Sequence, residues 1–298
     1  MKKHYSYNRK KSANIRKAKR IILFVTSVVI VMCVGALAAQ RIYKATQDVN
    51  ASEIESENKS GQYLSLENDP VADDVAFVEK YLYQQDLGIM PDGADGRKIA
   101  YLTFDDGPSD TVTPMILDIL KEENVKATFF ILGQALEKND INKELLKREV
   151  LEGHAIGNHT YSHNYKYLYP NGTVNVDNFM SDVEKNNTLF KSILGDDFHT
   201  RSIRFPGGHM SWKGMEPLDN ILSIEDYHQV DWNTLPKDAE GGRKNASQLV
   251  QEFIKTVSGR EKAIILMHDN YGKEETAKAL PEIIKYLKEQ GYEFRTMK

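Results

Sequence analysis

Residues 98–108 read KIAYLTFDDGP, and this stretch indicates how the rest of the chain folds. A short apolar run bounded by turn residues is typical of a strand buried in a sheet. The run ends in Asp105 and Asp106, and Gly107 and Pro108 then supply a turn. The stretch therefore predicts a strand that carries two adjacent acids at its carboxyl end.

Similar short apolar runs recur along the chain, separated by amphipathic stretches. Strands are expected at 98–104, 126–132, 154–158, 201–205, 227–232, 262–268 and 292–296. Apolar residues at helical spacing lie between them, at 111–123, 142–152, 175–194, 215–225, 245–258 and 274–290. Strands that alternate with helices form a parallel sheet, so the sequence predicts an α/β domain that is wound open or closed into a barrel.

Polar side chains stand where five of the expected strands end. They are Asp105 and Asp106, His159 and His163, Arg204, Asp231 and Trp232, and His268 and Asp269. In α/β barrels the carboxyl ends of the strands form one face, and active sites lie on that face. We therefore expect these residues, which are distant in the sequence, to meet in one site.

Two histidines of this set have the spacing of a metal-binding pair. His159 and His163 are four residues apart, so on a helical turn their rings project from one face. With a carboxylate from a strand end, they suit a divalent transition ion that keeps open positions for water and substrate. The same spacing also occurs in surface or core histidines, and the same ligand set serves non-haem iron oxygenases.

The adjacent aspartates of FDDGP have two interpretations. A turn needs only one Asp before Gly and Pro, and two neighbouring carboxylates repel each other. The functional interpretation assigns one Asp to the metal and the other to removing a proton from the attacking water. A purely structural turn is the alternative.

Five short motifs in a fixed order carry a family resemblance. They are TFDDGP (103–108), GNHTYSH (157–163), RFPGG (204–208), VDW (230–232) and ILMHD (265–269). Together they resemble the motifs of the NodB-type polysaccharide deacetylases, carbohydrate esterase family four, over residues 98–298. The resemblance implies a distorted (β/α)7 barrel and a divalent metal, usually zinc, with cobalt or another divalent ion as alternatives. It also implies removal of acetyl groups from N-acetylglucosamine units or, in some branches, from acetylated sugars such as xylan.

The resemblance also implies roles for individual residues. Asp105 becomes the general base and His268 the general acid that protonates the leaving amine. The implied metal ligands are Asp106, His159 and His163.

Four further positions have implied supporting roles. Arg204 would pair with Asp105, and an opposite charge nearby favours the ionised carboxylate. Asp231 would orient His268 and favour its protonated form. The backbone N–H of Gly207 would stabilise the oxyanion, and the pocket for the acetyl methyl group would be lined by Trp232 and Leu266.

Position 207 departs from the pattern of the family. Many members have an aromatic residue there, which helps to cover the sugar, whereas Gly207 supplies only backbone. Its N–H survives the change, so we expect substrate preference rather than catalysis to differ. Either His209, Met210 and Trp212 replace the missing wall, or they pack the loop that follows.

The average composition of the chain conceals regions of very different character. The 298 residues are 41% hydrophobic and 28% charged, which excludes collagen-like, low-complexity and wholly disordered proteins. The net charge is -4, but residues 1–20 carry nine Lys or Arg and no acid, which leaves -13 for the remainder. Cys33 is the single cysteine, so no disulfide forms within the chain.

A hydrophobic run directly follows the basic tail. Residues 21–39 contain no charge and, as a helix, reach about 28 Å, close to the hydrocarbon thickness of a bilayer. Basic residues before such a span keep the amino terminus in the cytoplasm. We therefore expect a single-pass anchor, then a disordered extracellular linker at 40–70 and a short helix and lead-in at 71–97. Cleavage near Ala38 followed by secretion is one alternative, and a nucleic-acid-binding tail is a weaker one.

These features predict a membrane-anchored, metal-dependent N-deacetylase that acts on wall glycan outside a cell of the Gram-positive type. The expected partners are the glycan and the membrane, without nucleic acid or an obligate protein partner. An O-acetyl esterase is the nearest alternative. A non-catalytic glycan-binding module ranks lower, because it would have lost Asp105, His268 or a metal ligand.

Overall fold

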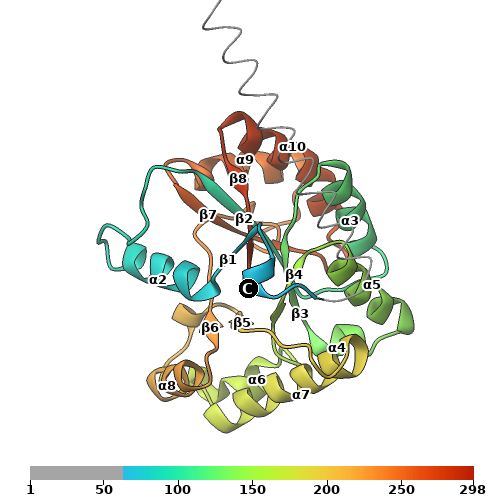
Figure 1. Cartoon of the computed structure of the whole chain (residues 1–298), viewed down its shortest axis with the longest axis vertical. Coiled ribbons are helices and arrows are strands. Elements are labelled where there is room, and N and C mark those ends of the chain that lie inside the picture. The colour runs from blue at the N-terminus through green and yellow to red at the C-terminus, as the bar shows by residue number, and fades with distance from the viewer. Residues whose placement is uncertain (1–62) are drawn as a thin grey trace, which may run out of the picture. The chain divides into compact units, whose positions relative to one another are not determined.

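Figure 1 shows a computed structural model of the chain, which describes residues 63–298. The predicted basic tail at 1–20, the predicted membrane span at 21–39 and all but the end of the predicted linker lie outside these residues. Among the described residues, no helix combines the length and the apolar character needed to cross a bilayer. The anchor therefore stays a prediction.

The centre of the fold is a seven-stranded sheet in which every pair of neighbouring strands is parallel. Its strands are β2 (Ile99–Asp105), β3 (Thr128–Ile131), β4 (Ala155–Asn158), β5 (Ser202–Ile203), β6 (His228–Gln229), β7 (Lys262–His268) and β8 (Glu293–Phe294). The order is β6-β5-β4-β3-β2-β7, and β8 pairs with the first residues of β2. The parallel α/β class predicted from the sequence is confirmed.

Helices surround the sheet (Figure 1). The longer ones are α2 (Val75–Asp86), α3 (Thr113–Glu122), α5 (Asp140–Leu151), α7 (Val176–Leu194), α8 (Glu216–Ile224), α9 (Ala246–Val257) and α10 (Glu274–Glu289). Single turns are formed by η1 (Leu66–Asn68), α4 (Gly133–Leu136), α6 (Tyr165–Leu168), η2 (Pro170–Gly172) and η3 (His209–Ser211). The helices predicted after residue 98 are all present, because their apolar residues recur at helical spacing, and some of them also have polar caps. Asn245, for example, forms a capping box with Gln248 at the start of α9.

Several strands are shorter than predicted, most clearly β5 and β6. β5 and β6 have two residues each, whereas the sequence predicts strands at 201–205 and 227–232. The backbone still bonds just beyond each of them. The N–H of Arg204 donates to the carbonyl of Asn158, and the N–H of Val230 donates to that of Ile203. The residues that follow these strands are therefore held in place.

The barrel is incomplete between β6 and β7. In the described residues β6 does not pair with β7, and the segment beyond β6 meets β7 at an isolated parallel bridge between Thr234 and Ile265. Helix α2 lies beside β6 (Figure 1), and its buried Val78 and Leu82 belong to one core cluster with Ile264 of β7. The distorted (β/α)7 barrel implied by the resemblance is thus a partial barrel of parallel strands, with α2 packed against the gap.

The folded part begins earlier than predicted. The sequence predicts a disordered linker through residue 70, but Tyr63 packs against Phe198 with ring centroids 4.9 Å apart. The carboxylate of Asp69 is buried and lies 2.7 Å from Nζ of Lys298. Immediately afterwards, β1 (Ala72–Asp73) pairs with β9 (Thr296–Met297). Residues 63–70 are therefore part of the domain, because they pack against Phe198 and pair with the last residue, Lys298.

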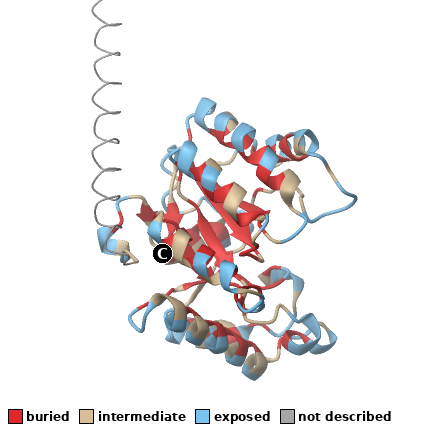
Figure 2. Cartoon of the chain, turned by 90° about the vertical axis from the view of Figure 1, so that its right-hand side faces the viewer, coloured by how far each residue is buried: buried red, intermediate tan, exposed pale blue. Residues whose placement is uncertain are grey.

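Buried residues gather on the strands and on the helix faces that turn toward them (Figure 2). All seven positions of β2 are buried, as expected for a parallel strand that is covered on both faces. The largest core cluster joins the sheet to helices α3, α5, α9 and α10. The carboxyl edge of this well-packed sheet gives the polar side chains fixed positions.

Candidate active site

Four of the predicted site residues lie at the carboxyl edge of the sheet. Asp105 and His268 are the last residues of β2 and β7, and the register of these two strands pairs them directly. His159 directly follows β4, and Arg204 directly follows β5. The parallel topology therefore brings residues from four separate segments to one place.

Asp106, His159 and His163 form a cluster with the geometry of metal ligands. One ligand atom from each lies within 4.8 Å of the other two. Oδ1 of Asp106 is 3.4 Å from Nε2 of each histidine. Nδ1 of His159 donates to the carbonyl of Arg204 at 2.7 Å, which leaves the Nε2 lone pair directed into the cluster.

The polar atoms of this cluster fit a cation. Oδ1 of Asp106 is buried and has no hydrogen-bond donor among the described residues, which costs free energy unless a cation neutralises it. Burial opposes ionisation of Asp106, but the neighbouring His159 and His163 hold its pKa well below the usual value. One carboxylate and two imidazoles are ligands that zinc and similar ions accept.

A loop, not the predicted helical turn, carries the two histidines. Residues 159–163 are irregular, and both Thr160 and His163 have positive φ, 65° and 51°. A carboxylate oxygen of Asp182 accepts hydrogen bonds from the N–H and the hydroxyl of Ser162, which fixes the loop. The rings of His159 and His163 lie 5.0 Å apart because this loop turns back on itself.

Arg204 forms the predicted ion pair with Asp105. Its guanidinium is fully buried, and Nη1 lies 2.8 Å from Oδ1 of Asp105. The same group donates to the Thr103 hydroxyl and to the carbonyls of Val230 and Asp231. Such a buried cation needs all of these partners, so it holds the Asp105 carboxylate in one orientation. Oδ2 of Asp105 lies 3.8 Å from Nε2 of His159, beside the ligand cluster.

Asp238, and not Asp231, orients His268. Nδ1 of His268 donates to Oδ1 of Asp238 at 2.9 Å, and the backbone N–H of His268 donates to the other carboxylate oxygen. Burial disfavours protonation of His268, but Asp238, with smaller contributions from Asp105 and Asp106, outweighs burial and raises the pKa of His268 to about 9. The predicted pairing of Asp231 with His268 is wrong, because Asp238 already occupies Nδ1.

Asp231 instead holds the loop that contains Gly207. Both of its carboxylate oxygens accept from the N–H of His209 at 3.1 Å. The ring of His209 in turn bonds Asp219 of α8 at 2.9 Å, an interaction that raises the pKa of His209. The loop that carries the expected oxyanion donor is therefore tied to two separate elements.

The two side chains expected to line the pocket for the acetyl methyl group are at least partly buried in the structure. Leu266 is nearly buried, and it lies two residues before His268 on β7, so both side chains face the same side of the strand. Trp232 is half-buried, and its ring lies 5.8 Å from the guanidinium of Arg204. The placement of the acetyl methyl group between Trp232 and Leu266 stays a prediction.

Sequence reasoning did not single out Asp238 and gave no role to Asp269, although both acids lie near the site. Asp238 lies in an irregular segment that follows Asp231 by seven positions, so the sequence offered two acids and no pattern to choose between them. Asp269 is fully buried beneath the FDDGP turn, where a Cβ at Gly107 would overlap its carboxylate. Burial and the negative charges of Asp106 and Asp105 raise the pKa of Asp269 to about 7, while its bond from Thr113 opposes the rise.

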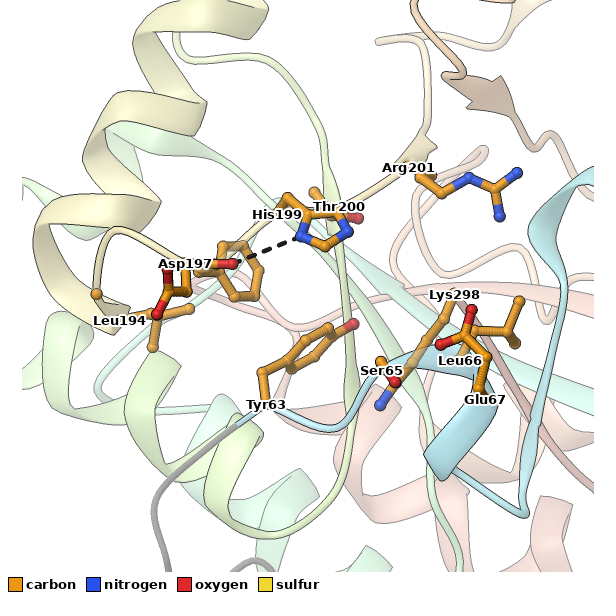
Figure 3. A pocket seen from close by; sticks show the side chains of 12 residues that line it. Tyr63, Ser65, Leu66, Glu67, Leu194, Asp197, His199, Thr200, Arg201 and Lys298 are labelled. Carbon is orange, nitrogen blue, oxygen red and sulfur yellow. Dashed lines mark hydrogen bonds between the residues drawn. The ribbon is translucent and has the colours of Figure 1, made fainter.

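A cavity of about 630 Å³ lies away from these residues (Figure 3). Its walls include Tyr63, His199 and Arg201, which precede or lie outside the strands, whereas the catalytic candidates follow strands. The cationic groups in its walls are already paired, Arg201 with Asp226 and Lys298 with Asp69. None of the predicted site residues lines this cavity.

Comparisons with known proteins point to one family. The polysaccharide deacetylase profile matches residues 92–215. A peptidoglycan-N-acetylglucosamine deacetylase of Bacillus cereus is 35% identical over 207 residues, which cover 66% of this chain and 68% of the relative. PgdA, a peptidoglycan-N-acetylglucosamine deacetylase of Listeria monocytogenes, is 35% identical over 208 residues, which cover 70% of this chain but 40% of the relative. The solved structure of a Streptococcus mutans CE4 esterase has 33% identity and a TM-score of 0.71, covering 80% of this chain and 97% of that chain.

The matches to deacetylases identify the chain as a hydrolase, and its fold is a partial barrel of parallel strands surrounded by helices. The family is equally clear from the extent of these matches. The chain belongs to the polysaccharide deacetylase family.

Proposed function

We propose that the chain removes acetyl groups from N-acetylglucosamine residues of peptidoglycan or a related wall glycan. The observation that carries this proposal is the pairing of Asp105 with His268 across β2 and β7, beside the cluster of Asp106, His159 and His163. The names of the Bacillus cereus and Listeria monocytogenes relatives support the choice of glycan.

Asp106, His159 and His163 would hold a divalent metal ion, and zinc is the ion we propose first. When bound there it would polarise the acetyl carbonyl and acidify a water molecule. Three properties of the chain support this assignment: the donor set, the orphaned Oδ1 of Asp106, and the His159 tautomer set by the Arg204 carbonyl.

The side chains of the protein perform the proton transfers. Asp105, fixed by Arg204, accepts a proton from the attacking water. The N–H of Gly207 donates to the oxyanion that forms at the acetyl carbon. His268, kept protonated by Asp238, then gives its proton to the departing nitrogen, so that glucosamine leaves as a neutral amine.

Acetate release from purified wall tests the activity. The full chain, solubilised in detergent, is incubated with peptidoglycan, and muropeptide fragments are compared by mass before and after. Each glucosamine that loses an acetyl group should lose the corresponding mass, and a chelator should stop the reaction until zinc is restored. Activity that persists after complete metal removal would refute the metal assignment, and an unchanged fragment pattern would refute the substrate.

We also propose that the chain is a single-pass membrane protein with its catalytic domain outside the cell. The basic residues at 1–20 and the uncharged run at 21–39 support this topology. Protease added to intact cells should digest the part after residue 40 and spare a tag placed before residue 20. Protection of the catalytic domain in intact cells, with digestion only after lysis, would contradict the proposal.

A further inference from the structure

Two aromatic side chains fill the space next to Gly207. A Cβ at Gly207 would lie 3.1 Å from Cζ2 of Trp212 and 3.4 Å from the hydroxyl of Tyr165. Gly207 also has a φ of +82°, a conformation that a residue with a side chain rarely adopts. Side chains from two other segments therefore occupy the space that a side chain at position 207 would fill.

Trp212 is fixed in this position. Its ring stacks on Tyr169 with centroids 4.0 Å apart and an interplanar angle of 7°. Its indole N–H donates to the carbonyl of Pro206 at 2.9 Å, one residue before Gly207. Trp212 therefore packs against the loop and also forms a fixed wall of the space beside Gly207.

Tyr165 contacts Trp212 on one side and His163 of the ligand cluster on the other. Its ring centroid is 5.2 Å from that of Trp212 and 5.1 Å from that of His163. Its side chain is 44% exposed, and its hydroxyl has no hydrogen-bond partner within residues 63–298. An exposed aromatic ring with a free hydroxyl thus lies between a candidate metal ligand and the candidate oxyanion donor.

We propose that Tyr165, backed by Trp212, is the stacking surface for the pyranose ring whose acetamido group is hydrolysed. A pyranose has an apolar face of C–H groups and a rim of hydroxyls, which match an aromatic ring with a free phenol at its edge. The 5.1 Å between the rings of Tyr165 and His163 leaves Tyr165 within reach of the sugar that carries the reacting acetyl group. This inference rests on the proposed function and names the residue that selects a sugar substrate.

Replacement of Tyr165 by alanine should separate sugar substrates from small ones. With the full chain in detergent, Tyr165→Ala should raise KM for an N-acetylglucosamine oligomer by roughly tenfold, equivalent to about 1.4 kcal/mol of lost binding. Turnover of 4-nitrophenyl acetate, which has no pyranose ring, should stay within about twofold of wild type, because the base and metal cluster are unchanged. Bound metal should stay equal in the two proteins.

Two further variants distinguish stacking from other roles. Tyr165→Phe keeps the ring and should retain most of the affinity for the oligomer. Tyr167→Ala is the matched control, because Tyr167 lies on the same short helix with 39% exposure and makes no ring contact with another described residue. It should act like wild type on both substrates.

Each contrary result has a distinct meaning. Equal losses of Tyr165→Ala on the oligomer and the aryl acetate would overturn the inference, because Tyr165 would then act through His163. A phenylalanine variant as defective as the alanine variant would refute the stacking surface. If wild type cleaves the aryl acetate but releases no acetate from the oligomer, the proposed function fails and the sugar-stacking role fails with it.

Discussion

Asp105→Asn is expected to remove almost all acetate release while the metal content stays at the wild-type level. Asparagine has the shape of aspartate but cannot take up the proton of the attacking water. A positioned general base contributes a factor on the order of 10²–10⁴, so kcat should fall by that amount. The measurement is acetate release from an N-acetylglucosamine oligomer, together with metal analysis of each purified protein.

The contrast with Asp106→Asn makes this prediction specific. Asp106 belongs to the ligand cluster, so its amide variant should lose bound metal as well as activity. Asp105 is bonded to the buried Arg204, and removing one partner of a buried ion pair costs roughly 3–5 kcal/mol of stability. A melting curve must therefore show that Asp105→Asn is folded at the assay temperature. Near-normal turnover by a folded, metal-loaded Asp105→Asn protein would refute the base assignment.

The sequence allowed the fold to be predicted well because its apolar runs are short and separated by amphipathic stretches. β2 and β7 could be located from their hydrophobicity, and their parallel direction follows from the helices that alternate with the strands, whereas their direct pairing is seen only in the structure. The start of the domain could not be placed in this way. Residues 63–70 are polar, and they are ordered by contacts with Phe198 and Lys298 that no local pattern reveals.

The same division applies to the site. Residues at strand ends, such as Asp105 and Arg204, could be placed on one face because parallel strands end at the same edge of the sheet, and their pairing was implied by the family resemblance. Asp238 could not be assigned, since it reaches His268 from an irregular segment whose path depends on packing. Tyr165 was missed for a related reason, because its position beside Gly207 comes from the way two loops meet in space.

His268→Ala should impair amide hydrolysis far more than ester hydrolysis. An amide nitrogen leaves readily only when it is protonated, whereas 4-nitrophenolate leaves without a proton. Loss of the general acid should therefore lower kcat/KM for the N-acetylglucosamine oligomer by a factor on the order of 10²–10⁴, and that for 4-nitrophenyl acetate by tenfold or less. Equal losses on the two substrates would mean that His268 does not donate the proton to the leaving group.

The pH dependence of the wild type and of Asp238→Asn completes this prediction. His268 acts in its protonated form, and its pKa of about 9 keeps it protonated up to that pH. Wild-type kcat/KM for the oligomer should therefore fall only as the pH rises through about 9.

Asp238 makes the largest contribution to this raised pKa against the effect of burial, so Asp238→Asn should lower the pKa of His268. The proton is then lost at lower pH, and activity at pH 8 should drop much more than activity at pH 6. The same linkage applies to folding: the stabilisation by charged His268 is complete below its usual value of 6.5 and disappears as the pH rises through about 9. An Asp238→Asn profile that is lower at every pH but has the same alkaline limb would show that Asp238 only positions the ring, and that another group sets the pKa of the acid.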